Sequence, residues 1–73
     1  MLIHINTYAN LPYAPPYAAT FLKDSETDSY WFEIINATFG NLVTKPIGPF
    51  GDLGTALDAA RDWRPEPGKA ATL

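Results

Sequence analysis

The residue types that most often carry catalysis are scarce in this chain. It contains one histidine, His4, and no cysteine, so a thiol nucleophile, a disulfide and a cysteine-type zinc site are excluded. A lone histidine, with no helper nearby in the sequence, is typical of a polar side chain on a strand rather than a general base or metal ligand. The sequence also lacks a Ser-His-Asp arrangement, a phosphate-binding loop and a dinucleotide fingerprint. We therefore expect a protein that is not an enzyme.

One spacing imitates a metal site, the acidic triplet Asp24-x-Glu26-x-Asp28, which resembles the start of an EF-hand calcium loop. Such a loop requires glycine where this chain has Ser29, and a bidentate glutamate where it has Ile35. We interpret the triplet as a solvated hairpin turn whose charges discourage edge-to-edge pairing. We expect neither a metal nor another cofactor. We expect no secretory signal, and therefore no use of the glycosylation sequon at Asn36-Ala37-Thr38.

The charge balance limits the possible partners. The 73 residues include five Lys plus Arg and eight Asp plus Glu, which gives a formal charge of −3 and an isoelectric point near 4.7. Binding through phosphate neutralisation needs a basic face, so we do not expect nucleic acid as a partner. No stretch approaches a membrane span or a signal peptide. With no cysteine, the chain fits a reducing compartment, and we expect a cytoplasmic protein with no membrane contact.

The elements that must position any site follow from hydrophobic periodicity and turn residues. Alternation predicts a strand over residues 2–8, and residues 18–23 and 30–36 read as a hairpin closed by a polar turn. Residues 42–45 are predicted to return antiparallel after a turn at Gly40-Asn41, and Ile47 to Gly51 to form a connector. Asp52 is a good N-cap for a helix ending near Trp63.

The fold class that these elements predict is α+β. We expect a small antiparallel meander of three to four strands with one C-terminal helix packed on one face. Residues 1–64 form the single domain, and residues 65–73 a flexible tail without periodicity. The placement of residues 2–8 and the strand order do not follow from the sequence.

The most informative feature is the apolar surplus of the strand over residues 30–36. One face carries Tyr30, Phe32 and Ile34, and the other carries Trp31, Glu33 and Ile35. A helix of about twelve residues spans about 18 Å and covers one face only. Three candidates could shield the other face: the proline- and tyrosine-rich connection over residues 11–17, a second copy of the chain, or a different partner.

We interpret this surplus as the mark of a non-catalytic protein-interaction module. Aromatic side chains would anchor a protein partner with a basic or mixed surface, and carboxylates would steer the encounter. The predicted partner-binding residues are Tyr13, Tyr17, Asp24, Glu26, Asp28, Trp31, Glu33 and Ile35. Small acidic proteins without cysteine are common among phage and mobile-element inhibitors of host nucleic-acid machinery, of the anti-CRISPR or anti-restriction type, and the composition fits that class.

Two other classes of function remain open. The extra apolar face could close on itself, which would make the chain a homodimer or a larger homo-oligomeric accessory domain. Alternatively, Trp31 and the tyrosines could stack against a small ligand or single-stranded nucleic acid. The second alternative needs cationic neighbours, and only Lys23 and Lys45 lie near the predicted sheet.

Overall fold

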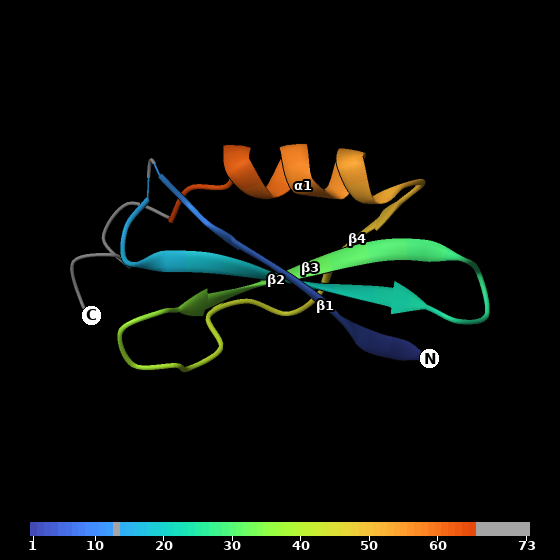
Figure 1. Ribbon diagram of the computed structural model, residues 1–73, viewed down its shortest axis with the longest axis horizontal. Helices are drawn as coiled ribbons and strands as arrows, with labels where there is room; N and C mark the ends of the chain where they lie inside the picture. The colour runs from blue at the N-terminus through green and yellow to red at the C-terminus, as the bar shows by residue number, and fades with distance from the viewer. Residues whose placement is uncertain (13, 66–73) are drawn as a thin grey trace.

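The computed structural model describes residues 1–12 and 14–65 of the chain. It contains strands β1 (Leu2–Asn10), β2 (Tyr17–Asp24), β3 (Ser29–Asn36) and β4 (Ile47–Phe50), followed by helix α1 (Leu53–Asp62). The strands form one antiparallel sheet in the order β1-β2-β3-β4. Figure 1 shows α1 lying along one side of this sheet. The predicted α+β meander with one helix is confirmed, with four strands.

The helix side of the sheet holds the core. Phe21 and Phe32 lie directly opposite each other on β2 and β3, and the Phe32 ring stacks on Phe50 with centroids 5.8 Å apart. Alternation along β3 sends Tyr30, Phe32 and Ile34 to this side. There they meet the two buried alanines of α1, Ala56 and Ala60. The predicted division of the β3 side chains between the two faces is therefore present in the structure.

The strand that returns beside β3 differs from the prediction. Residues 42–45 form no strand, because only Leu42 makes a bridge, to Ile35. The fourth strand is instead Ile47–Phe50, which pairs with β3 through Tyr30–Phe50 and Phe32–Ile47. This stretch, predicted as a connector, pairs because Ile47 and Phe50 can bury their side chains against the core. The predicted tail over residues 65–73 lies, beyond Pro65, outside the described residues.

The connection between β1 and β2 packs on the helix side of the sheet. Leu11, Ala14 and Tyr17 are buried members of the main core. The ring of Tyr17 meets Trp63 edge to face, with centroids 5.4 Å apart. The connection therefore closes the end of the helix layer, so these three residues do not shield the face that carries Trp31.

Helix α1 begins at the predicted cap. The carboxylate of Asp52 accepts hydrogen bonds from the backbone N–H of Thr55 at 2.7 Å and from its hydroxyl at 3.0 Å. These bonds satisfy one of the free N–H groups of the first turn. The Thr55 N–H, followed by its hydroxyl, holds the pKa of Asp52 below its ordinary value of 3.8.

The Asp52 cap predicts an acid-sensitive contribution to stability. Because the pKa of Asp52 is lower in the folded chain, its contribution is fully present above the unfolded value and is lost as the pH falls through the folded one. We expect wild type to be more stable than Asp52→Ala at neutral pH, and this difference to shrink in strong acid. Thermal melts of the two proteins and of Asp52→Asn, whose amide still caps but does not titrate, measure the effect. A wild-type advantage over Asp52→Ala that is independent of pH would contradict it.

Candidate functional site

The sheet face opposite α1 brings together three of the predicted partner-binding residues. Trp31, Glu33 and Ile35 alternate with the core residues of β3, so they share this face. Across the sheet, Leu22 lies opposite Trp31 and Thr20 opposite Glu33. On β1, His4 lies opposite Leu22 and Tyr8 opposite Thr20. We call this surface the open face.

Trp31 is half-buried on the open face and packs on the backbone of β4. A Cβ placed on Gly48 would lie 2.7 Å from the Trp31 ring, so the absence of a side chain there makes room for the indole. The indole N–H donates to the hydroxyl of Ser29 at 3.2 Å. Contacts within its own sheet therefore hold Trp31 in place, and part of the residue remains exposed to solvent.

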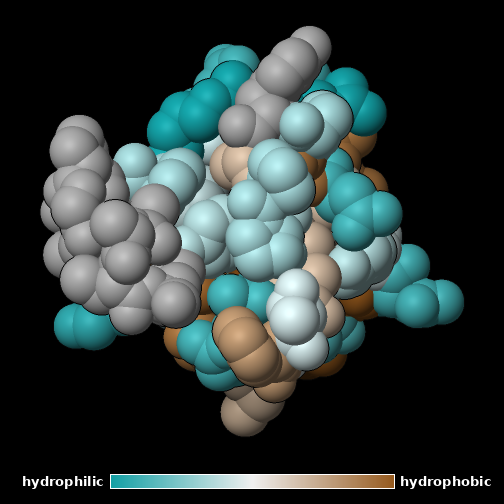
Figure 2. Space-filling view, turned by 90° about the vertical axis from the view of Figure 1, so that its left-hand side faces the viewer, coloured by the Kyte–Doolittle hydropathy of each residue, from teal (hydrophilic) through white to brown (hydrophobic). Residues whose placement is uncertain are grey.

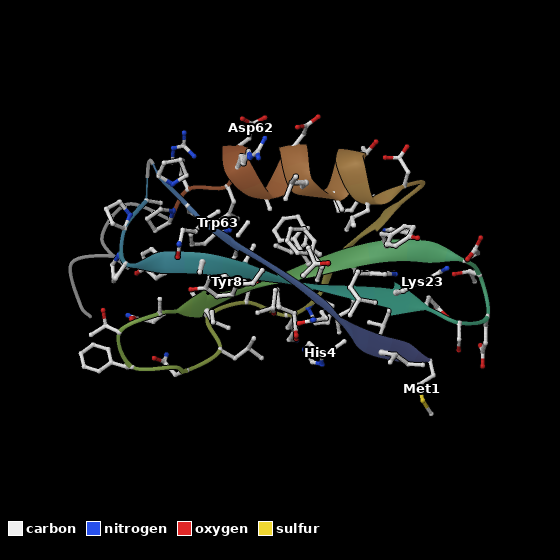
Figure 3. The ribbon with its side chains drawn as sticks, viewed as in Figure 1. Met1, His4, Tyr8, Lys23, Asp62 and Trp63 are labelled. Atoms are coloured by element: carbon white, nitrogen blue, oxygen red, sulfur yellow. The ribbon has the colours of Figure 1, made fainter. Side chains whose placement is uncertain are left out.

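Glu33 occupies the middle of the open face and is only 7% exposed. Its carboxylate lies 2.9 Å from Nε2 of His4. Figure 3 shows His4 on the side of the sheet away from α1. A buried carboxylate needs a hydrogen-bond or ionic partner, and His4, the one histidine of the chain, provides it for Glu33. The pair therefore gives the carboxylate of Glu33 a hydrogen-bond partner across the sheet.

The acidic triplet lies at one end of the sheet and is matched by positive charge. Asp24 and Glu26 lie 3.0 Å and 3.7 Å from the amino group of Met1, and Asp28 lies 2.9 Å from Nζ of Lys23. The Glu26 N–H, followed by the Met1 ammonium, holds the pKa of Asp24 below its ordinary value. The hydrogen bond that the Lys23 ammonium donates to the Asp28 carboxylate raises the pKa of Lys23. These carboxylates therefore have internal partners.

One of the two predicted tyrosines, Tyr17, does not join the open face. Tyr17 is buried beside Trp63 on the helix side, and Tyr13 lies outside the described residues. The seven described residues of the predicted eight thus fall into separate places: three share the open face, three form the charged hairpin turn, and Tyr17 belongs to the core.

A second apolar surface, which the sequence reading missed, lies on the segment over residues 37–46. Phe39 is 75% exposed, Leu42 55% and Val43 37%. Figure 1 shows this segment on the side of the sheet away from α1. Viewed from the end of the molecule where the segment lies, Figure 2 shows apolar side chains on the lower side, with polar ones among them. The one sequence feature that could have indicated this surface is Phe39, a large apolar residue beside Gly40 in a stretch otherwise typical of a turn.

Hydrogen bonds at both ends fix the backbone of the 37–46 segment. Asn36 holds the turn: its Oδ1 accepts from the N–H groups of Thr38 and Phe39, and its N–H donates to the carbonyl of Asn41 at 2.9 Å. Beyond the turn, Val43 donates to the carbonyl of Ile34 at 2.7 Å. Gly40 takes a φ of 77°, a region that suits glycine. The exposed side chains therefore project from an ordered scaffold.

Asn36 is also the residue of the glycosylation sequon. It is 1% exposed, and its side-chain oxygen caps the turn. The amide nitrogen that glycosylation would modify is buried and has no hydrogen-bond partner among the described residues. In this fold the sequon is therefore structural.

The Leu42–Ile35 bridge joins the 37–46 segment to the open face.

In residues 1–12 and 14–65, no cluster of three or more histidine, aspartate and glutamate side chains is placed to hold a metal. No helix in this part of the chain is long and apolar enough to cross a membrane. Comparison with models of known protein families, with curated proteins and with solved structures found no match to the chain.

Proposed function

We propose that this chain is a non-catalytic interaction module that binds another protein through the 37–46 segment. One observation carries the proposal: three large apolar side chains, Phe39, Leu42 and Val43, stand exposed within five consecutive residues on a hydrogen-bonded backbone. Scattered exposed apolar residues need no explanation, whereas a contiguous group supports an interaction site.

The energetics of binding favour this surface over a flexible loop. Burying one large apolar side chain in a partner contributes roughly 1.5–3 kcal/mol, so Phe39 and Leu42 together could anchor a modest interface. The bonds from Asn36 and Val43 fix the backbone before binding, which lowers the entropic cost of association. The Leu42–Ile35 bridge lets the contact extend onto the open face toward Ile35.

The charge of the chain supports a partner with a basic or mixed surface. The chain carries a net charge of −3, which would attract such a partner at long range. Lys45 is the only charged residue in the 37–46 segment, so the contact itself would be mainly apolar. We infer that the acidic hairpin turn contributes through net charge more than through direct pairing, because its carboxylates have internal partners.

We expect the double variant Phe39→Ser/Leu42→Ser to lose partner binding and keep its fold. Surface substitutions usually change the free energy of unfolding by about 0.5 kcal/mol or less each. The measurement is capture from a lysate of the source organism, together with urea unfolding. Asp58→Ser is the control, since Asp58 is an exposed residue of α1, outside both the 37–46 segment and β1. Proteins captured equally by wild type, control and double variant would contradict the proposal.

The narrower interpretation, an inhibitor encoded by a phage or mobile element, rests on the small size and acidity of the chain. A cytoplasmic location likewise rests on its lack of cysteine. Both the inhibitor interpretation and the cytoplasmic location are part of the proposal. The identity of the captured protein would decide whether the chain is such an inhibitor.

A further inference from the structure

The two edges of the sheet differ in how they resist pairing with another strand. At one edge β4 has four residues and includes Pro49, which lacks a backbone donor. At the other edge β1 has nine residues, Leu2–Asn10, without proline, lysine, arginine or a carboxylate. Short length, proline and charge are the usual protections of an edge strand. Apart from an irregularity between His4 and Tyr8, β1 has none of these protections.

The backbone groups that β1 turns away from β2 can be assigned from its pairing. Ser25 donates to the carbonyl of Met1 at one end, and Leu11 donates to the carbonyl of Tyr17 at the other. Inward- and outward-facing groups alternate along an antiparallel strand. Counting from either end, Leu2, His4, Tyr8 and Asn10 point their N–H and C=O groups outward.

The irregularity in β1 does not change this assignment. Between His4 and Tyr8 the strand advances four residues while β2 advances only two, from Leu22 to Thr20. The difference of two residues is even, so the residues before and after the irregularity keep the same alternation of inward- and outward-facing backbone groups. The strand stays continuous through this stretch. Asn6, midway between the flanks, is exposed.

We propose that β1 pairs with β1 of a second copy, antiparallel, about a two-fold axis at Asn6. The outward groups are spaced symmetrically about this residue, so Leu2 meets Asn10 of the partner subunit and His4 meets Tyr8 of the partner subunit. The two four-stranded sheets become one continuous sheet. This surface is separate from the 37–46 segment, so the dimer and the proposed partner contact are independent.

A second copy is the occupant that fits this edge best. Symmetric pairing gives every assigned outward donor and acceptor of one β1 a partner in the other: the residue pairs repeat on both sides of the axis, as an isologous interface requires. The strand brings no permanent charge, so two copies place no like charges across the axis. On the helix side, the half-exposed Ile3 lies across from Ala9 of the partner subunit and loses contact with water.

Charge substitutions at Asn6 test both the dimer and its register. We expect wild type to sediment as a concentration-dependent dimer in analytical ultracentrifugation. Asn6→Lys and Asn6→Asp each place two like charges directly opposite at the axis, and should each raise the dimer dissociation constant about fivefold. An equimolar mixture of the two variants should restore the dimer, because opposite charges then meet across the axis. Asn41→Lys, the same change on the 37–46 segment, should leave association unchanged.

Several results would overturn this inference. A wild-type chain that remains a monomer at its highest soluble concentration excludes the pairing. A dimer that Asn6→Lys leaves as tight as wild type places the interface elsewhere. A folded mixture of the two variants that stays monomeric rules out the two-fold axis at Asn6, and circular dichroism establishes that both variants are folded.

Discussion

Replacing Phe32 with alanine is expected to cost about 3–5 kcal/mol in the free energy of unfolding. Phe32 is 2% exposed, and its ring contacts both Phe21 and Phe50. It therefore joins the two central strands to β4. A chain of this size has a total stability of roughly 4–11 kcal/mol, so the substitution should leave little or none. Urea unfolding followed by circular dichroism measures the loss.

Phe32→Leu is the control for this prediction, since leucine keeps most of the buried volume and should cost much less. The two variants together separate the loss of packing from the loss of an aromatic ring. If Phe32→Ala unfolds at nearly the same urea concentration as wild type, the core does not depend on the packing described here.

Adding one methyl group at Gly48 should destabilise the fold by about 1–3 kcal/mol. The Cβ of Gly48→Ala would lie 2.7 Å from the Trp31 ring and 2.9 Å from the backbone carbonyl of Tyr30. The indole can move, but the carbonyl belongs to β3 and can shift only with the strand. We expect a lower unfolding midpoint in urea and a change in tryptophan fluorescence as the Trp31 ring is displaced.

Gly51→Ala is the matched control, because a Cβ at Gly51 meets no atom within 4 Å. Alanine there restricts the unfolded chain and should be neutral or slightly stabilising. Equal effects at the two glycines would show that backbone entropy, and not the close approach of Trp31, accounts for any change at Gly48.

The parts of the fold that the sequence predicted are those with strong local signals. The alternation of β3 separated Phe32 from Trp31 correctly, and α1 begins after the Asp52 cap and ends near Trp63 as expected. The choice of fourth strand depended on tertiary packing. Residues 42–45 and Ile47–Phe50 each carry two large apolar side chains and both adjoin Pro46, and burial against the core decided between them.

The candidate site was harder to predict because side-chain partners come from distant parts of the chain. Periodicity placed Trp31, Glu33 and Ile35 on one face, but it could not reveal that His4 pairs with Glu33 across 29 residues. Tyr17 looked like an exposed anchor and is a core residue beside Trp63. The exposure of Phe39 follows from the turn built by Asn36, whose hydrogen bonds the sequence does not display.

The most direct test of the interaction proposal is photo-crosslinking from position 39. A photoreactive phenylalanine analogue in place of Phe39 keeps an aromatic ring at the most exposed apolar position of the 37–46 segment. The same analogue at Asp58, on the exposed side of α1, is the control. We predict that position 39, and not position 58, crosslinks a distinct foreign protein in a lysate of the source organism. Crosslinks of equal yield from both positions, or crosslinks only to a second copy of the chain, would contradict the proposal.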